Sequence, residues 1–551
     1  MNLGYPYFKI DSLNSFLIPA IGLFFVLTFI YSLKFMRGKK NLLQYYAYII
    51  FTAIAAIGVV LANNLAVLLI FWGFLGFTLY LLINFGTDDT GETARKALII
   101  VGGTDALMLL GIGILFYITG SFQMDNIRLR LSSSYYLPAL AYFCIALACF
   151  AKAGAMPLHS WIPPCAKDAP IPVVAYLPAS LDKLLGIYLL ARISLNIFEM
   201  NAAMNVFLMC IGAFTVLAAV MMALVQHDMK KLLGYHAVSQ VGYMVLGIAT
   251  GNPIGIAGGI FHMINHAVYK SCLFFTAGNV EYRTKTTELD ELGGLSRLMP
   301  ITYISCLVAS LSISGVPPFN GFVSKWMIYQ GLIQRLGSGG PERFLVALCL
   351  VVALFGSGLT LASFMKLIHS VFLGQRINQE GKPKIGEVSP AMWIPCLTLA
   401  VICVVFGVFA NQLPLKYFIF PAVPGVEFTG IWYAGVSTAL IIIALVAGLF
   451  IFNFNFFRPR MRQDKVFVGG EPIDFTPHAV TGTEFYNTIR EYGILKGIYR
   501  LAEKGAFDIY EQGKKLAVLS SPLRYLHNGI LPTYLVWMLL GMLGLLIWSC
   551  I

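Results

Sequence analysis

The sequence has little charge: Asp, Glu, Lys and Arg make up 12% of its 551 residues, about half the share found in an ordinary soluble domain. Hydrophobic residues make up 58%. This balance excludes a soluble globular chain, and it comes from apolar runs of roughly 17 to 25 residues, each long enough to cross a membrane as a helix. The runs lack the alternation of a barrel strand. The composition therefore predicts an all-α integral membrane protein.

Metal, redox and disulfide chemistry also lack their sequence signatures. The ten cysteines are scattered, mostly within apolar segments, with no CxxC pair and no Cys/His cluster at the spacing of metal ligands. We therefore expect no iron–sulfur cluster, no disulfide framework, no metal and no cofactor in this chain. The formal charge of +12 is typical of cytoplasmic loops in a membrane protein, so we expect no nucleic-acid partner.

The N-terminal stretch MNLGYPYFKIDSL lacks the basic flank and the cleavage site of a signal peptide. We therefore expect the first span, near 15–35, to remain in the mature protein. Clusters of basic residues follow the first and the fourteenth predicted spans. They comprise Lys34, Arg37, Lys39, Lys40, Arg458, Arg460, Arg462 and Lys465. Basic loops favour the cytoplasmic side, which predicts an outward-facing N-terminus in a prokaryotic inner membrane.

The apolar runs predict about fifteen transmembrane helices. They lie near 15–35, 43–62, 64–84, 97–119, 136–152, 172–198, 204–226, 231–250, 254–278, 300–315, 319–336, 343–373, 391–411, 430–453 and 530–550. We divide the chain into a multi-span core (1–455), a cytoplasmic connector (456–483), an amphipathic helix (484–521) and a C-terminal membrane anchor (528–551).

The predicted amphipathic helix is too charged to span a membrane, because its charges alternate with apolar residues at steps of three and four. If it is continuous, it reaches about 50 Å along a surface. Four glycines weaken that continuity. They are Gly493, Gly497, Gly505 and Gly513.

Two apolar regions are interrupted by Pro and Gly, and each carries a lysine beside the interruption. In AKAGAMPLHSWIPPCAKDAPIPV, Lys152 precedes the break, whereas in SISGVPPFNGFVSKWMIY, Lys325 follows it. Paired interruptions of this kind indicate inverted repeats whose broken helices line an ion path. Ordinary proline kinks beside interfacial lysines are the alternative.

The stretch FHMINHAVYK places three titratable groups inside an apolar span. His262, His266 and Lys270 follow at steps of four, so they share one helix face over about 12 Å. A charged group in lipid costs about 2.5 to 3.5 kcal/mol, so such residues face the bundle interior or water. Because histidine and desolvated lysine exchange protons, the spacing predicts a relay.

Three more ionisable residues lie within predicted spans. Lys183 is too deep in its span to reach the interface easily, so we interpret it as functional. Asp182 points about 100° away from Lys183 on a helix, and the two are expected to serve different neighbours. Asp105 is interpreted as a counter-ion that keeps a lysine charged.

Other polar residues are left open between function and structure. Lys366 and His369 lie near the end of a span, where interfacial residues are common. The stretch DMKKLLGYHAVSQVGYM offers a set of polar groups that suits either ordered water or a helix–helix polar seam. These groups are Tyr235, His236, Ser239 and Gln240.

Together the motifs carry a family resemblance. The chain resembles the antiporter-like membrane subunits shared by respiratory complex I, the energy-converting membrane-bound hydrogenases and the multisubunit sodium/proton antiporters. The resemblance is closest between Asn63 and Lys325. Its carriers are AKAGAMPLHSWIPPCAKDAPIPV, DMKKLLGYHAVSQVGYM, FHMINHAVYKSCLFFTAGNV, LDELGGLSRLMP and SGVPPFNGFVSKW.

The resemblance implies two inverted five-helix repeats, each with a broken helix and a half-channel. By motif match, Lys152 falls on the family's pumping lysine and Lys183 on the lysine of the following helix. The titratable face of 261–270 matches the connecting relay, and Lys325 matches its terminal ionisable residue. The amphipathic segment before the last span resembles the lateral helix of the most distal such protein, which lies along its neighbours.

One position departs from the family pattern. Where the family usually carries a glutamate after tryptophan, FWGFLGFTLY has Gly73 after Trp72, so Lys152 lacks its expected partner. We hypothesise that Asp105, or else Asp182, takes over, and that the first half-channel is otherwise weakened or silent.

The sequence thus predicts a proton-translocating, or sodium-translocating, subunit of a redox-driven complex. The stretch LPASLDKLLGIYLLARI favours a hydrogenase-type complex. The alternatives are a cation/proton antiporter that works alone or as one of several subunits, a scaffold that does not pump, and, as the least favoured, a redox enzyme. The expected partners are lipid, other membrane subunits contacted partly through the lateral helix, and redox subunits that carry iron–sulfur clusters.

Overall fold

The structure is a computed structural model, and it describes residues 7–86, 90–131, 136–337, 339–374, 385–428, 430, 433–453, 483, 486–517, 520, 527 and 529–550. The predicted basic cluster at 458–465 and nearly all of the predicted connector 456–483 lie outside these residues. The chain forms two compact units, residues 1–491 and 492–551.

The first unit is built from helices. In chain order they are α1 (Leu17–Phe35), α2 (Leu42–Leu61), α3 (Leu65–Ile83), α4 (Thr90–Thr119), η1 (Met124–Asn126), α5 (Leu137–Ala153), α6 (Ile162–Asp168), α7 (Ile171–Tyr176), η2 (Leu177–Leu181), α8 (Asp182–Arg192), η3 (Ile193–Ile197), α9 (Ala202–Leu224), α10 (Met229–Ala249), α11 (Pro253–Thr284), η4 (Leu289–Glu291), α12 (Pro300–Ser314), α13 (Asn320–Gly337), α14 (Arg343–Ile368), η5 (His369–Leu373), α15 (Pro390–Val408), η6 (Leu415–Ile419), α16 (Ala434–Asn453) and α17 (Asn487–Glu491). Two short strands, β1 (Leu129–Arg130) and β2 (Phe198–Glu199), pair in parallel.

The all-α membrane class is confirmed. Among the described residues, ten helices are long and apolar enough to cross a membrane. Each of the other five predicted spans coincides with a helix that is shorter or more polar: α5, α11, α12, α13 and α16. The count of fifteen spans stays a prediction.

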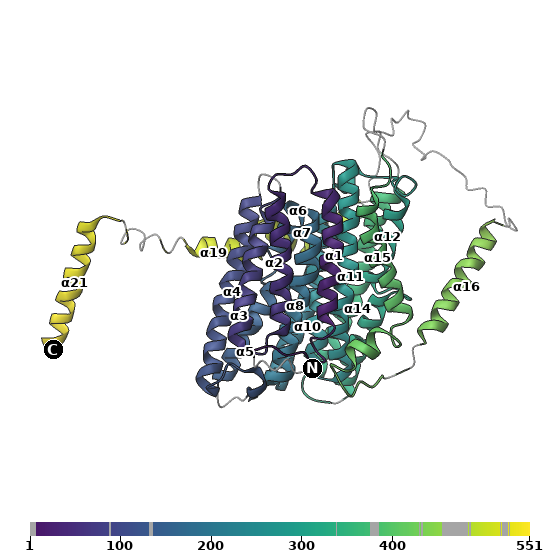
Figure 1. The fold of residues 1–551 in the computed structure, drawn as a ribbon. Coiled ribbons are helices and arrows are strands. Elements are labelled where there is room, and N and C mark those ends of the chain that lie inside the picture. Colours follow the sequence, from purple (N-terminus) through teal and green to yellow (C-terminus); the bar gives the residue numbers. More distant parts are fainter. Residues whose placement is uncertain are drawn as a thin grey trace. The chain divides into compact units, whose positions relative to one another are not determined.

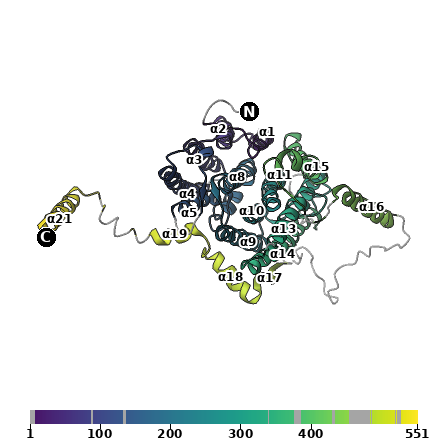
Figure 2. The same cartoon turned by 90° about the horizontal axis from the view of Figure 1, so that it is seen from below.

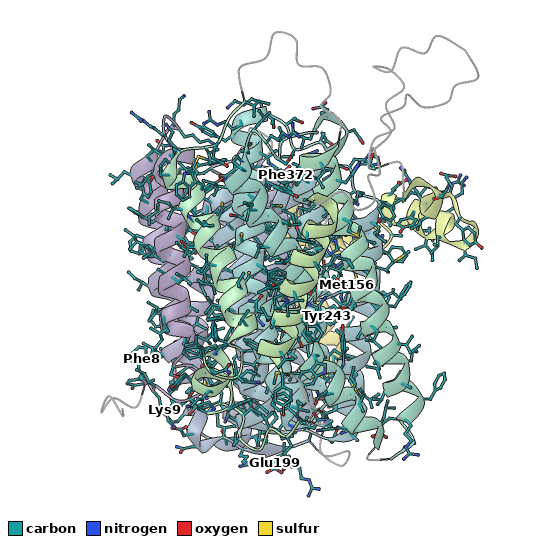
Figure 3. The ribbon with its side chains drawn as sticks, turned by 90° about the vertical axis from the view of Figure 1, so that its right-hand side faces the viewer. Phe8, Lys9, Met156, Glu199, Tyr243 and Phe372 are labelled. Carbon is teal, nitrogen blue, oxygen red and sulfur yellow. The ribbon has the colours of Figure 1, made fainter. Side chains whose placement is uncertain are left out.

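The bundle has two ends, which we name after the lysines that lie there. At the Lys9 end, Phe8 pairs with Ala62, and β1 pairs with β2. At the Lys39 end, the loop beginning at Asp228 pairs with the loop at Glu288. Figure 1 shows the long helices α1 to α5 running side by side between these ends, and Figure 3 labels Lys9 at one end and Phe372 at the other.

Helix α11 lies inside the bundle and packs against α7, α10, α12, α13 and α15 (Figure 2). Glycine permits close approach on two sides. A Cβ added at Gly259 would stand 2.8 Å from the carbonyl oxygen of Met244 on α10, and one at Gly258 would stand 2.9 Å from the backbone nitrogen of Ile328 on α13. The polar side chains of these three helices are therefore brought into contact.

Two helices end at a glycine and are followed by a loop and a further helix. Helix α5 ends at Ala153 before Gly154, whose φ is +84°, and α12 ends at Ser314 before Gly315, whose φ is +81°. Glycine takes this left-handed conformation without a steric penalty, which ends each helix. A cis X–Pro peptide bond follows in both loops. Because α5 enters from the Lys9 end and α12 from the Lys39 end, the breaks fit the expected inverted repeats.

The second unit contains α18 (Gly493–Glu503), α19 (Ile509–Ala517) and α21 (Leu531–Cys550). The predicted amphipathic segment 484–521 is therefore divided among α17, α18 and α19 rather than forming one continuous helix. Gly505, with a φ of +71°, follows the end of α18. A left-handed residue there stops the helix, so a glycine does interrupt the segment, as its sequence indicated.

Candidate functional site

The titratable face of α11 lies within the bundle. His262, His266 and Lys270 are each 0% exposed. They lie at i, i+4 and i+8 of a single unbroken helix, as the sequence predicted. The face therefore presents two imidazoles and an amine to the interior over about 12 Å.

His262 has hydrogen-bond partners on both neighbouring helices. Its Nδ1 lies 2.8 Å from the hydroxyl of Ser324 on α13, and its Nε2 lies 3.0 Å from Oε1 of Gln240 on α10. Ser324 directly precedes Lys325, which was predicted as a site residue. The imidazole thus connects α10, α11 and α13 at one point.

His266 and Lys270 differ from His262. Neither ring nitrogen of His266 and no proton of the Lys270 amine has a hydrogen-bond partner among the described protein groups. The Lys270 Nζ lies 5.8 Å from the Phe274 ring centre and 5.7 Å from that of Phe364. Aromatic faces attract a cation but satisfy none of its hydrogen bonds.

Lys183 and Asp182 begin α8, directly after the π-helical turn η2. Both are 0% exposed, and the Lys183 amine and both Asp182 carboxylate oxygens lack hydrogen-bond partners within the described part of the chain. The Lys183 Nζ lies 5.6 Å from the Trp161 ring centre and 3.4 Å from where a Cβ on Gly154 would be. The amine beside the first helix break is therefore that of Lys183.

Lys152 points toward α3 instead. Its Nζ lies 4.5 Å from the Trp72 ring centre and donates to the Trp72 carbonyl oxygen at 3.3 Å. The Trp72 indole N–H in turn donates to Asp105 Oδ1 at 2.8 Å. Lys152 and the carboxylate of Asp105 are therefore connected through one tryptophan.

Gly73 occupies the position where the family usually carries a glutamate, and this position does not face Asp105. Gly73 is exposed, and a Cβ added there would meet no atom within 4 Å. At Gly76, by contrast, an added Cβ would stand 3.4 Å from Asp105 Oδ2. The bare backbone of Gly76 leaves room for the Asp105 carboxylate, which is consistent with the hypothesis that Asp105 replaces the absent acid.

Lys325 lies at the second break. Its Nζ donates to the carbonyl oxygen of Ile313 at 2.9 Å and lies 4.7 Å from the Tyr243 ring centre. In a continuous helix that carbonyl would accept from residue 317, which is a proline and has no N–H. The lysine thus binds a backbone acceptor that the break sets free.

These groups interact electrostatically with their neighbours in one series. The series runs Asp105, Lys152, Asp182, Lys183, Lys270, His266, His262 and Lys325. All eight residues predicted for the site are therefore in it. Sequence reasoning missed the connecting groups, among them Trp72 and Ser324, although each lies next to a residue that it singled out.

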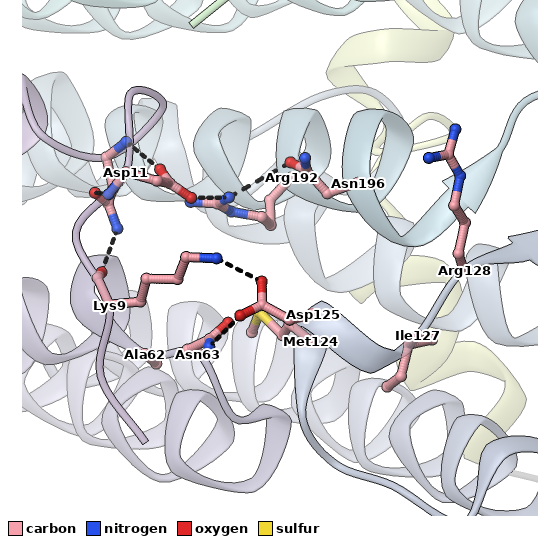
Figure 4. Close-up of a pocket in the computed structure, with 11 residues that line it drawn as sticks. Lys9, Asp11, Ala62, Asn63, Met124, Asp125, Ile127, Arg128, Arg192 and Asn196 are labelled. Carbon is pink, nitrogen blue, oxygen red and sulfur yellow. Dashed lines mark hydrogen bonds and ion pairs between the residues drawn. The ribbon is translucent and has the colours of Figure 1, made fainter. Parts of the chain in front are cut away.

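A second polar region occupies the Lys9 end. A cavity of about 220 Å³ is lined there by two ion pairs, Lys9 with Asp125 and Arg192 with Asp11 (Figure 4). Burial alone would raise the pKa of Asp11, but the hydrogen bond and charge of Arg192 hold it below its usual value. Arg192 ends α8, so this pair fixes the Lys9 end of the helix that carries Lys183.

A family model and curated relatives match this chain. The model of the NADH:quinone oxidoreductase/Mrp antiporter transmembrane family matches residues 62–360. The A component of a Na(+)/H(+) antiporter from Alkalihalophilus pseudofirmus is 32% identical over 424 residues, which are 73% of this chain and 52% of that protein. The chain spans about half the length of the curated relatives it matches.

Solved structures show the same fold. A chain of the membrane-bound sulfane sulfur reductase, an archaeal respiratory membrane complex, matches with a TM-score of 0.79 at 23% identity, over 98% of this chain and 89% of that one. A chain of the Mrp complex from Dietzia sp. matches with a TM-score of 0.68 at 22% identity, over 75% and 84%. Both of these solved structures are complexes.

Proposed function

The chain belongs to the NADH:quinone oxidoreductase/Mrp antiporter transmembrane family, and from this premise we propose that it is an ion-translocating subunit of a multisubunit cation/proton antiporter. The names of its curated relatives support this alternative over the hydrogenase-type complex that the sequence favoured. The proposed carriers are the eight groups of the series from Asp105 to Lys325. Protons are the proposed moving ion, because lysine and histidine exchange them.

One observation carries the proposal: three basic groups in the middle of the series lie buried without protein hydrogen bonds in the described structure. These are Lys183, His266 and Lys270. A buried polar group without a protein partner is usually hydrogen-bonded to ordered water. Water between groups on one helix face would complete a path along which protons move. A purely structural polar seam would instead satisfy its buried groups with protein hydrogen bonds.

The proposed coupling is electrostatic. Lys183 and Lys270 carry like charges and influence each other. At an effective dielectric near 20, two unit charges interact by about 4 kcal/mol at 4 Å, and the energy falls in inverse proportion to their separation; about 1.4 kcal/mol changes a protonation ratio tenfold. A proton arriving at one lysine therefore favours release from the next.

The proposed orientation places the Lys39 end in the cytoplasm, because Lys34, Arg37, Lys39 and Lys40 cluster at or next to that loop. The N-terminus and the Lys9 end would then face outward. The amphipathic segment 484–521 is proposed to contact other membrane subunits.

A redox-driven complex is the second candidate function. A fold match that covers 98% of this chain is to a chain of a respiratory complex, whereas the match to the curated antiporter relative covers only 52% of that protein. In that case the partners would include redox subunits with iron–sulfur clusters. Mass spectrometry of the subunits that co-purify with the native complex separates the two candidates.

Replacing Lys270 with alanine tests the proposed function in everted membrane vesicles that contain the native complex. Sodium-dependent proton movement should fall about a hundredfold, because proton carriers commonly contribute that much or more. The control is Ser271→Ala, whose hydroxyl donates to the Ala175 carbonyl at 2.9 Å and has no place in the series. Transport by Lys270→Ala at the control level would leave the scaffold reading in place.

A further inference from the structure

Helix α10 carries a further buried imidazole, which the series from Asp105 to Lys325 does not use. His236 is 0% exposed, and its Nε2 lies 2.7 Å from the hydroxyl of Ser363 on α14. Its Nδ1 has no hydrogen-bond partner in the described residues. An imidazole with one nitrogen bonded and the other open can accept a proton on one side and release one on the other.

One helical turn beyond Ser363, α14 carries Lys366, which is 4% exposed. Its Nζ donates to the carbonyl oxygens of Leu224, at 2.6 Å, and Gln226, at 2.8 Å, at the Lys39 end of α9. Residues three apart on a helix are neighbours on its surface, so Ser363 and Lys366 lie on the same side of α14. The amine therefore stands between His236 and the end of the bundle.

Lys366 also meets a group at the surface. Its charge is attracted by Asp290, whose Oδ2 lies 2.7 Å from Nδ1 of His227. The side chains of both Asp290 and His227 are 38% exposed. The Lys366 Nζ lies 5.7 Å from the centre of the Tyr486 ring, which covers it, and the Tyr486 hydroxyl donates to the Ala362 carbonyl oxygen at 2.9 Å. A titratable pair open to solvent thus lies next to a lysine that is covered from it.

At its inner end this set of groups reaches the main series through Phe364. The His236 ring centre lies 4.7 Å from that of Phe364, and the Lys270 Nζ lies 5.7 Å from the same ring. Phe364 is 1% exposed. The phenyl ring is therefore a shared apolar neighbour of the imidazole and the amine, so a proton passing between them requires water beside it.

We propose that His236, Ser363 and Lys366 form a branch of the relay that carries protons between Lys270 and the His227–Asp290 pair at the Lys39 end. The inference rests on the proposed function and adds a path to it. In one transfer, the Lys366 ammonium gives a proton toward Ser363, whose hydroxyl passes its own to His236 Nε2. His236 Nδ1 then gives its proton to the neutral Lys270 amine, so one proton moves and nothing else is consumed.

Lys366→Arg distinguishes a carrier from a structural group. Arginine keeps the charge and can still donate to the Leu224 and Gln226 carbonyls, but it does not give up its proton in proteins. The branch predicts at least a tenfold loss of sodium-dependent proton movement in vesicles containing the native complex, with unchanged subunit content. Transport at the wild-type rate would overturn the branch, because arginine can replace a lysine whose only role is to hold α14 against α9.

His236→Gln provides the second variant and decides the matter if Lys366→Arg fails to assemble. Glutamine keeps a side-chain hydrogen bond to Ser363 but cannot exchange protons through a ring. The charged groups that act on the imidazole are Lys270, Lys325 and Lys366, and His236→Gln leaves all three in place. The branch predicts at least a tenfold loss of sodium-dependent proton movement with unchanged subunit content. Transport at the wild-type rate would overturn it.

Lys270→Ala, measured beside these variants, separates the two levels of the argument. Loss of transport in Lys270→Ala together with wild-type transport in His236→Gln would refute the branch and retain the relay. Wild-type transport in Lys270→Ala would refute the relay itself, and with it the branch.

Discussion

The two helix breaks are built alike in their backbone and differently in their charges. At each, a glycine with positive φ ends the first half-helix and a lysine amine lies beside that glycine: Lys183 beside Gly154 and Lys325 beside Gly315. Lys183 comes from the following helix rather than from the broken one, whereas Lys325 comes from the second half of its own broken helix.

Their counter-charges differ more. At the first break, Asp182 interacts with both Lys152 and Lys183, and Asp105 reaches Lys152 through Trp72. No carboxylate among the described residues interacts with Lys325, whose amine has the Ile313 carbonyl and the Tyr243 ring. The first break can therefore balance its charges internally, whereas the Lys325 charge at the second break depends on the rest of the relay. From this difference we infer that the first half holds a proton and that the second half releases it at Lys325, which we call the exit of the relay.

The largest effect is expected at the second break. Lys325→Ala should lower sodium-dependent proton movement about a hundredfold or more, because within the described residues Lys325 is the basic group that is hydrogen-bonded to the Ile313 carbonyl. Lys416→Ala is a suitable control, since this lysine lies in η6 and belongs to neither break. The rate in vesicles with equal subunit content gives the measurement. If Lys325→Ala transports as the control does, the second break is not the exit.

An intermediate effect is expected at the first break from Asp105→Asn. The variant keeps an acceptor for the Trp72 indole but removes the charge that balances Lys152, so proton movement should be lost, by at least about tenfold. Survival of pumping would mean that Asp182 alone compensates, or that this half is silent. Gly73→Glu should not restore transport in Asp105→Asn, because residue 73 faces outward and no atom lies within 4 Å of a Cβ there. Rescue would contradict the assignment of Asp105 as the replacement acid.

The sequence predicted the residues of the site better than their contacts. Helical spacing was enough to put His262, His266 and Lys270 on one face, since α11 is unbroken over 32 residues. The motif match put Lys152 at the first break, but the amine found beside Gly154 is that of Lys183. A lysine side chain has four carbons and many rotamers, so its amine can lie far from the backbone position that the sequence reveals.

Contacts between distant segments were beyond local patterns. The Trp72 link joins residues 33 positions apart, and the His236 link to Ser363 joins residues 127 apart. Periodicity describes one helix at a time, so it could identify His236 as polar but not choose between water and a helix seam. The amphipathic segment shows the converse: its glycines already indicated where α18 ends, and Gly505 does lie there.

The smallest effect on transport is expected at the Lys9 end, where the ion pair of Asp11 with Arg192 fixes that end of α8. Asp11→Asn should leave the transport rate within about twofold but lower the stability of the complex by about 1.5 to 3 kcal/mol, the net value of hydrogen bonds to charged groups.

Because Arg192 keeps the pKa of Asp11 below its ordinary value of 3.8, the stability that the ion pair contributes is complete at pH values above that value. It is lost as the pH falls through the lower, folded-state pKa, because between the two pKa values the unfolded chain binds more protons than the folded one. Thermal unfolding measured between pH 3 and 7, a range chosen to bracket ordinary carboxyl titration, should therefore show the wild type approaching Asp11→Asn only at the acid end. Arg335 and Glu342, 3.0 Å apart near the end of the helix that carries Lys325, give the matched pair in the second half. Glu342→Gln should also lower the stability of the complex. A difference between wild type and Asp11→Asn that grows below pH 4 would contradict the sign of this argument.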